Sequence, residues 1–218
     1  MSRRLELIVF DWDGTLADSA GLIAGCIQRA CADLDLPVPA EEHARYVIGL
    51  GLHDALDYLV PGLAPQRQRE LADRYRLHYL AGDAAIPLFA GAREALDTLR
   101  GTGFRLAVAT GKSRRGLDRS ISQLGLGDCF DATRCADETA PKPDPLMLRE
   151  LLEELDVPAQ GALMVGDTVH DLDMAAAAGV PALAVCYGAH PRETLLKRPS
   201  LGCLDRFDQL LGWIRENG

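Results

Sequence analysis

The sequence predicts an α/β protein in which helices flank a Rossmann-like parallel sheet and an α-helical cap domain is inserted into the chain. The first observation is that short apolar runs rich in β-formers alternate with helical patterns. The second is that about 90 residues separate the first two runs, far more than a usual strand-helix-strand crossover needs. A length of 218 residues accommodates one domain with a smaller insert.

The sheet is predicted from four apolar runs, each followed by a polar or glycine-bearing turn and then by a helical pattern. They are residues 5–10, 104–109, 162–165 and 181–185. Ligands of parallel sheets bind beyond the carboxyl ends of the strands, so the residues directly after these runs are the expected functional segments. Those with polar chemistry are residues 11–15, 110–113 and 166–171. A fourth segment, residues 140–145, carries three prolines and precedes a predicted helix.

The insert has the periodicity of helices and no convincing strand. Apolar side chains recur at helical spacing, first at Leu22, Cys26 and Ala30 and later at Leu71 and Tyr75. We therefore assign residues 18–85 to a helical cap domain, and residues 1–17 and 86–218 to the α/β core domain. Residues 86–91 are the expected linker back to the core.

The composition is that of a folded globular protein with no nucleic-acid partner. Hydrophobic residues make up 48%, charged residues 25%, and the mean hydropathy is -0.02. A formal charge of -9 argues against nucleic-acid binding, which depends on basic residues. The apolar stretch at residues 7–10 is too short for a signal or membrane-spanning segment. We expect a cytoplasmic protein with no membrane partner.

The six cysteines are scattered and include no Cys-x-x-Cys pair. Because no export signal is recognised, we expect buried thiols in preference to disulfides or a zinc site. The cysteines are Cys26, Cys31, Cys129, Cys135, Cys186 and Cys203.

Two carboxylates follow the first predicted strand. Asp11 and Asp13 would share one face of an extended chain, and Gly14 allows the chain to turn behind them. Two close carboxylates suit metal binding, or a division of labour between a nucleophile and an acid/base. The alternative is an ordinary Asp-Gly turn that ends a strand.

Cationic and hydroxyl groups follow in two later segments. Thr110, Gly111 and Lys112 offer a hydroxyl, a flexible backbone N–H and an ammonium, which together suit a phosphoryl group. Lys142 lies between Pro141 and Pro143, and it is one of only three lysines beside twenty arginines. A compact point charge is therefore indicated in these loops. An ordinary turn and a chance distribution remain the alternatives.

The last segment places two further carboxylates at helical spacing. Asp167 and Asp171 are four residues apart and can lie on one face of a helix. Oxygen ligands without neighbouring His or Cys pairs favour Mg²⁺ over zinc. Acidic residues at this place can also act simply as helix caps.

The four segments, in this order, resemble the motifs of the haloacid dehalogenase superfamily over nearly the whole chain. Residues 11–16 with Asp18 and Ser19 are similar to motif one, and residues 110–112 to motif two. Residues 142–143 resemble motif three, and residues 166–168 with Asp171 resemble motif four. The helical insert after motif one matches the subgroup with a small α-helical cap.

The resemblance implies a mechanism. Asp11 would attack phosphorus to give an aspartyl-phosphate, and Asp13 would protonate the leaving oxygen and later activate water. Asp11, the backbone carbonyl of Asp13 and Asp167 would hold Mg²⁺, with Asp171 as a ligand or as support for one. Thr110, Gly111 and Lys142 would bind the phosphoryl oxygens.

The resemblance also narrows the reaction. The dehalogenases of this superfamily lack the second aspartate of motif one, whereas Asp13 is present here, which argues against dehalogenation. The phosphonate-cleaving members use a cap lysine, whereas residues 16–90 contain no lysine, which argues against that activity. Residues 13–19, 49–51 and 141–145 look most like the phosphoglycolate phosphatase group. A sugar-phosphate mutase such as a phosphoglucomutase, a pyrophosphatase, a nucleotidase and a non-catalytic phosphometabolite-binding protein remain alternatives.

Substrate choice is expected to lie in the cap, because the core motifs contact only the phosphoryl group and the metal. Arg45, His53 and the turn at residues 49–51 are the candidates, with Arg45 as the substrate-binding residue. The alternative for Arg45 is a solvated helix residue. We expect a small phosphorylated metabolite as the partner and a monomer or homodimer as the assembly.

Overall fold

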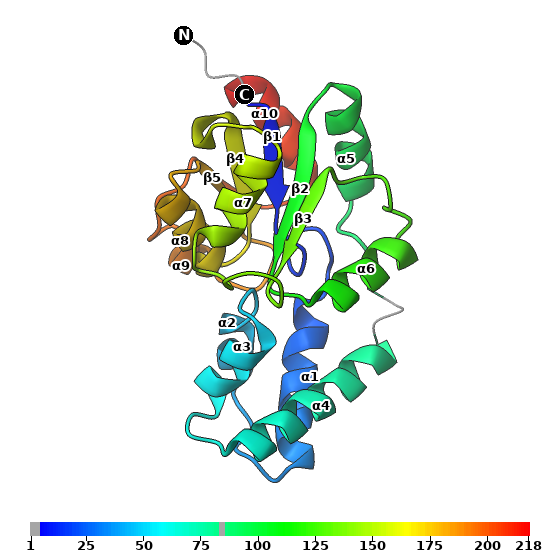
Figure 1. Cartoon of the computed structure of the whole chain (residues 1–218), viewed down its shortest axis with the longest axis vertical. Coiled ribbons are helices and arrows are strands. Elements are labelled where there is room, and N and C mark those ends of the chain that lie inside the picture. The colour runs from blue at the N-terminus through cyan, green and yellow to red at the C-terminus, as the bar shows by residue number, and fades with distance from the viewer. Residues whose placement is uncertain (1–4, 83–85) are drawn as a thin grey trace.

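The fold is a six-stranded sheet in the order β3-β2-β1-β4-β5-β6, with every neighbouring pair parallel (Figure 1). The computed structural model describes residues 5–82 and 86–218. The strands are β1 (Leu7–Phe10), β2 (Arg105–Thr110), β3 (Ala132–Cys135), β4 (Ala162–Gly166), β5 (Ala182–Val185) and β6 (Cys203–Leu204). The predicted α/β class with a Rossmann-like parallel sheet is confirmed.

Two of these strands, β3 and β6, were absent from the sequence prediction. Both lie at the edges of the sheet. Thr133 and Arg134 in β3 are only half-buried, and β6 has two residues, one of them half-buried. An edge strand covered on one side has no continuous apolar run, so the pattern that reveals β1, β2, β4 and β5 is missing.

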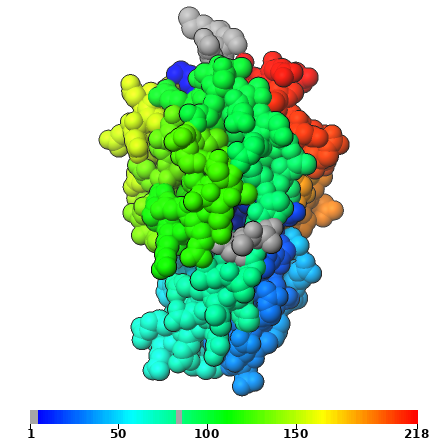
Figure 2. Space-filling model, turned by 90° about the vertical axis from the view of Figure 1, so that its right-hand side faces the viewer, coloured from blue at the N-terminus to red at the C-terminus, as the bar shows by residue number. Residues whose placement is uncertain are grey.

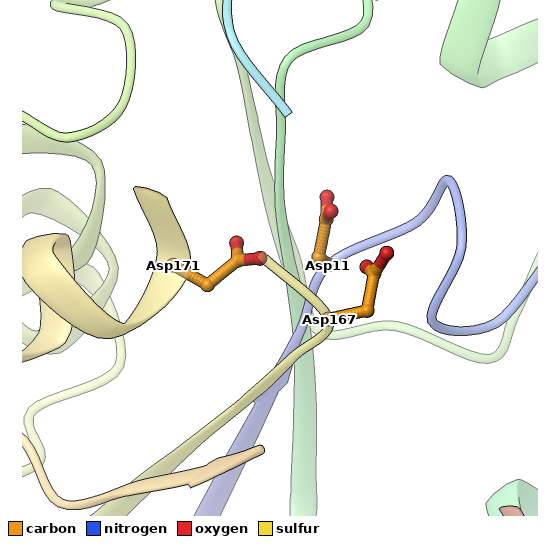
Figure 3. A group of neighbouring side chains, drawn as sticks. All are labelled: Asp11, Asp167 and Asp171. Atoms are coloured by element: carbon orange, nitrogen blue, oxygen red, sulfur yellow. The ribbon is translucent and has the colours of Figure 1, made fainter. Parts of the chain in front are cut away.

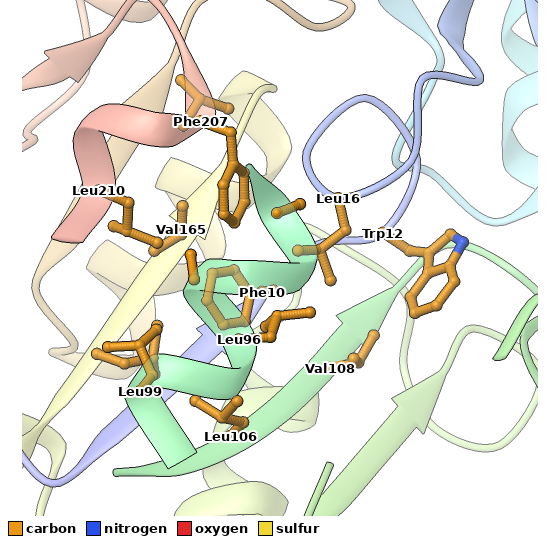
Figure 4. Packing of buried hydrophobic residues seen from close by; sticks show 14 of the residues in the cluster. Phe10, Trp12, Leu16, Leu96, Leu99, Leu106, Val108, Val165, Phe207 and Leu210 are labelled. Carbon is orange, nitrogen blue, oxygen red and sulfur yellow. The ribbon is translucent and has the colours of Figure 1, made fainter. Parts of the chain in front are cut away.

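Helices cover both faces of the sheet, because consecutive side chains of β1 point to opposite faces. Ile8 and Phe10 belong to one apolar cluster, and Leu7 and Val9 to the other. The first cluster packs under α5 (Ala92–Gly101), α6 (Arg114–Gln123), the 3₁₀ helix η3 (Phe207–Gln209) and α10 (Leu210–Asn217) (Figure 4). The second packs under α7 (Leu146–Glu154), α8 (Val169–Ala178) and α9 (Arg192–Leu195), and the 3₁₀ helix η2 (Ala159–Gly161) precedes β4.

The insert forms a separate group of four helices with an apolar cluster of its own. The helices are α1 (Ala20–Asp33), α2 (Glu41–Tyr46), α3 (Leu52–Leu59) and α4 (Pro65–Gly82). No strand occurs in the described part of the insert, which ends at residue 82. The predicted end of the cap at residue 85 lies outside the described residues, so the division into core and cap at residues 17/18 and 85/86 stays a prediction.

The helices of the insert lie beyond the carboxyl ends of β1 and β2, at the opposite end of the molecule from α10 (Figures 1 and 2). The two parts touch through the backbone at Gly111, where a Cβ would come within 2.5 Å of the Leu50 carbonyl oxygen. This close contact brings the turn at residues 49–51 onto the core loop that follows β2.

Four cysteines are buried as predicted, whereas Cys186 and Cys203 are half-buried. These two lie at the end of β5 and in β6, close to the sheet edge, where cover is incomplete. All six are free thiols. Among the described residues, none of the helices combines the length and apolar character that crossing a bilayer requires.

Candidate active site

The strand register brings the sequence-predicted segments together. Phe10 pairs with Val108 on one side and with Val165 on the other, so β1, β2 and β4 end within two residues of one another. Asp11 follows Phe10 directly and donates its backbone N–H to the Val165 carbonyl at 3.0 Å. Residues that are more than 90 positions apart in the sequence therefore share one edge of the sheet.

Three carboxylates form the centre of this edge. Asp11 comes from the end of β1, Asp167 follows β4, and Asp171 lies in the first turn of α8 (Figure 3). One carboxylate oxygen of each lies within 4.8 Å of those of the other two, and all three residues are buried. So much buried negative charge requires cations nearby.

Lys142 provides one of these cations. Its Nζ lies 2.8 Å from Asp11 Oδ1 and 2.6 Å from Asp171 Oδ1, and the residue is 1% exposed. Burial alone would lower the lysine pKa, but the attraction of Asp11 and Asp171 outweighs it and raises the pKa above its usual value. Lys142 is therefore a permanent ammonium between two carboxylates.

A single ammonium leaves the cluster short of positive charge. The Lys142 contact with Asp11 is not aligned as a hydrogen bond, and neither Asp11 oxygen accepts a hydrogen bond from the described residues. Burial, reinforced by the charges of Asp171 and Asp167, raises the pKa of Asp11 well above its usual value. Burial and the Asp171 charge raise the pKa of Asp167 to about 7. Hard oxygen donors with uncompensated charge fit a divalent cation such as Mg²⁺.

Asp167 and Asp171 are held differently. Asp167 accepts hydrogen bonds from Thr15 Oγ1 and from the Ala189 N–H, both at 2.7 Å. Asp171 Oδ2 accepts from the backbone and hydroxyl of Thr168 at 3.0 and 2.7 Å, in a capping box, while its Oδ1 faces Lys142. Asp171 thus caps α8 and also orients Lys142, which favours support over direct metal ligation.

Gly14 is required between the two acidic segments. Its φ of +86° is in the left-handed region, and a Cβ at this position would overlap the Asp167 carboxylate. The backbone of the first motif can therefore approach the fourth motif only with glycine at this position.

Asp13 turns away from the carboxylate cluster. It accepts from Ser19 Oγ at 2.7 Å, and Lys112 Nζ donates to its two oxygens at 3.0 and 3.1 Å. Its side chain is outside the group that could hold a metal, so only its backbone carbonyl fits the ligand role that the resemblance implies. The side chain lines the cavity instead.

The cavity between the core and the helices of the insert has a volume of about 600 Å³. Asp11, Asp13, Thr110 and Gly111 line it from the core side. From the insert, His53 and the turn at residues 49–51 line it as expected. Arg45 does not line it and forms an ion pair with Glu41 at 3.0 Å, which is the solvated-helix alternative.

Lys112, whose ammonium the sequence indicates as suited to a phosphoryl group, donates to Asp13 in the structure. Besides Asp13 it contacts the cap, donating to the Tyr79 hydroxyl at 2.7 Å and lying 4.7 Å from the ring centroid. The scarcity of lysine in the sequence was the feature that singled out Lys112, but nothing in the sequence pairs this residue with Tyr79 or Asp13.

Comparison with known proteins identifies the family of the chain. Residues 8–185 match the model of the family described as haloacid dehalogenase-like hydrolase. The chain belongs to this family. The resemblance predicted from the four motifs is thereby confirmed for the haloacid dehalogenase-like hydrolases.

Two relatives cover nearly the whole chain. "Probable phosphatase IndB" of Dickeya dadantii is 33% identical over 94% of this chain and 92% of its own length. A phosphoglycolate phosphatase of Rhodospirillum rubrum is 34% identical over 96% and 90%. Among solved structures, a haloacid dehalogenase-like hydrolase from Bacteroides fragilis has a TM-score of 0.87 at 24% identity, over 95% of this chain and 100% of its own. This last likeness concerns the fold.

Proposed function

We propose that this chain is a magnesium-dependent phosphatase that hydrolyses a small phosphate monoester through an aspartyl-phosphate at Asp11. The observation that carries the proposal is the buried Asp11 carboxylate, whose oxygens accept no hydrogen bond from the described residues, at the floor of the cavity. The names of the relatives support a phosphatase, and one of them makes phosphoglycolate a candidate substrate.

Each core residue has a place in the proposal. Asp11, Asp167 and the backbone carbonyl of Asp13 would hold Mg²⁺, which would neutralise charge on the transferring phosphoryl group. Asp171 would keep Lys142 in place beside Asp11. Thr110, Gly111 and Lys142 would bind phosphoryl oxygens.

The two steps follow from this arrangement. An Asp11 oxygen bonds to phosphorus as the ester P–O bond breaks, and protonated Asp13 delivers its proton to the leaving oxygen. Asp13, now a carboxylate, then takes a proton from a water whose oxygen attacks phosphorus. The bond from phosphorus to Asp11 breaks and inorganic phosphate leaves. Ser19 and Lys112 hold Asp13 toward the cavity for both transfers.

The division of the chain is part of the proposal. The core, residues 1–17 and 86–218, would carry the chemistry, and the cap, residues 18–85, would enclose a small phosphorylated metabolite. The cytoplasm is the expected compartment.

The test is phosphate release from p-nitrophenyl phosphate and from a panel of phosphometabolites, with Mg²⁺ and with EDTA. We expect release with Mg²⁺ only, and none from Asp11→Asn. Equal rates for Asp11→Asn and the wild type would overturn the mechanism, and isomerisation of a sugar phosphate without phosphate release would indicate a mutase.

The covalent step has its own readout. p-Nitrophenolate is a good leaving group that needs no proton, so Asp13→Asn should form the aspartyl-phosphate but hydrolyse it slowly. Mass spectrometry of quenched Asp13→Asn should show phosphate on the peptide that contains Asp11. A phosphate on any other residue would contradict the proposal.

A further inference from the structure

The cavity is lined mainly by apolar side chains once the core residues are set aside. The insert contributes Ile23, Ile27, Tyr75, Tyr79 and Leu80 from its helices, and Ile48 from the loop after α2. Binding sites with this kind of wall and only a few polar groups recognise apolar ligand bodies. Asp11, Asp13 and Thr110 line the phosphoryl end, and the polar side chains that the insert adds are His53, Asp54 and Arg76, besides the two tyrosine hydroxyls.

The size of the cavity points the same way. A volume of about 600 Å³ is in the range of sites for ring-containing ligands and could hold on the order of 20 water molecules. A two-carbon acid such as glycolate would leave most of the apolar wall in contact with water. Its binding would gain little from that wall.

The position of Asp13 relates the leaving group of the substrate to the apolar wall of the cavity. Asp13 is proposed to protonate the leaving oxygen, and Lys112 joins Asp13 to Tyr79 through contacts of 3.0 and 2.7 Å. The carbon attached to the leaving oxygen therefore begins next to Tyr79. Tyr75 stacks on Tyr79 with the ring centroids 5.8 Å apart and extends the aromatic surface.

The cation that contacts Asp13 has no free position for a glycolate carboxylate. Lys112 is the cation there, and its ammonium already contacts both Asp13 oxygens and the Tyr79 hydroxyl. Three arginines also line the cavity. Arg115 is exposed, the exposed Arg76 pairs with Asp73 at 2.8 Å, and Arg119 is half-buried.

We propose that this site selects phosphate monoesters whose leaving group is an apolar body the size of a ring, bound against Tyr75, Tyr79 and Leu80, in preference to a two-carbon acid. This substrate class rests on the proposed phosphatase function. It is a statement about the cap side of the cavity, so it can fail while the phosphatase stands.

The test uses non-hydrolysable probes, so that it reads binding without turnover. Calorimetry with Mg²⁺ present compares 2-phenylethylphosphonate with ethylphosphonate, which share the phosphoryl end and differ in the ring. We expect the wild type to bind the phenyl compound at least about tenfold more tightly. Equal dissociation constants, or tighter binding of ethylphosphonate, would overturn the proposal.

Two leucines of α4 form a matched pair of variants. Leu80 lines the cavity and is 51% exposed, whereas Leu77 does not line it and is 58% exposed. Leu80→Ala should reduce the preference for the phenyl compound by about threefold or more, and Leu77→Ala should keep the wild-type ratio. Equal effects of the two variants would refute the assignment of the wall.

Turnover separates this proposal from the phosphatase itself. The values of kcat/KM are measured for 2-phenylethyl phosphate, ethyl phosphate and phosphoglycolate, of which the first two have similar leaving alcohols. Asp11-dependent release that is fastest from phosphoglycolate would keep the phosphatase and overturn the ring preference. Tight binding of 2-phenylethylphosphonate without any phosphate release would support the apolar binding site and overturn the phosphatase.

Discussion

Replacing Lys142 by methionine would remove the ammonium that contacts both Asp11 and Asp171. The side chain is fully buried, with its Nζ 2.8 and 2.6 Å from the two carboxylates. Methionine keeps much of the volume but none of the charge. The substitution therefore leaves two buried carboxylates facing each other without compensation.

The cost follows from general values for buried ion pairs. Removing one partner of such a pair destabilises a protein by about 3–5 kcal/mol. In a chain of this length each kcal/mol lowers Tm by about 2–4 °C, so the expected fall in Tm is roughly 6–20 °C. Protonation of Asp11, whose pKa is already raised by burial, limits the loss at low pH.

The assay is thermal unfolding followed by circular dichroism at pH 8 and pH 5, with EDTA. The matched control is Lys197→Met, the same change at an exposed lysine. We expect a large fall in Tm at pH 8 for Lys142→Met, a smaller one at pH 5, and almost none for the control. Adding Asp171→Asn should restore part of the loss, because one uncompensated charge disappears.

The reasoning would be refuted if Lys142→Met unfolded within about 2 °C of Lys197→Met at pH 8, a shift well below that expected for a broken buried pair. It would also be refuted if Lys142→Met lost more stability at pH 5 than at pH 8. Either result would mean that Lys142 does not carry the charge balance of the cluster.

Three further predictions concern the same site. Without Mg²⁺, the Tm of the wild type relative to Asp167→Asn should fall as the pH rises from about 4 to about 7. The reason is that folding raises the Asp167 pKa from about 3.9 to about 7 and so favours the protonated carboxyl. A difference in Tm that does not change with pH would contradict this. Gly14→Ala should weaken Mg²⁺ binding measured by calorimetry. Gly62 is also at positive φ, but a Cβ there would meet nothing within 4 Å, so Gly62→Ala should lower stability and leave Mg²⁺ affinity unchanged. Equal Mg²⁺ affinities of the two variants would contradict the steric argument. Lys112→Met should lower kcat on ethyl phosphate by about tenfold or more, with a smaller change in KM. Tyr79→Phe should lower kcat less, because only one of the Lys112 contacts is lost. An unchanged kcat in Lys112→Met would contradict the role of Lys112 in positioning Asp13.

The core of the site could be predicted from sequence because parallel strands impose their own geometry. Asp11 and Asp167 each follow a buried strand and Thr110 ends one, and the register of β1 with β2 and β4 brings those strand ends close together. The order of the motifs then identified the family. Lys142 could be placed with them only through the resemblance, because its loop follows no predicted strand.

Other features depend on packing that the sequence does not reveal. The edge strand β3 was missed because its two middle residues are only half-buried. Arg45 was expected over the site, but the direction of its side chain depends on how α2 sits on the core, and it pairs with Glu41 one helical turn earlier. The pairing of Lys112 with Tyr79 joins two domains of the proposed division, and no periodicity encodes such a contact.

The cavity wall illustrates why substrate choice is harder to predict than reaction type. Ile23 and Ile27 recur four residues apart in α1, and the sequence pattern assigns them to the interior of a helix bundle. They do belong to the apolar cluster of the insert, and they also line the cavity. If the proposed ring preference holds, the same periodicity serves folding and binding, because the cap presents part of its own apolar cluster to the ligand. The binding comparison of the two phosphonates is therefore the measurement that tells these two roles apart.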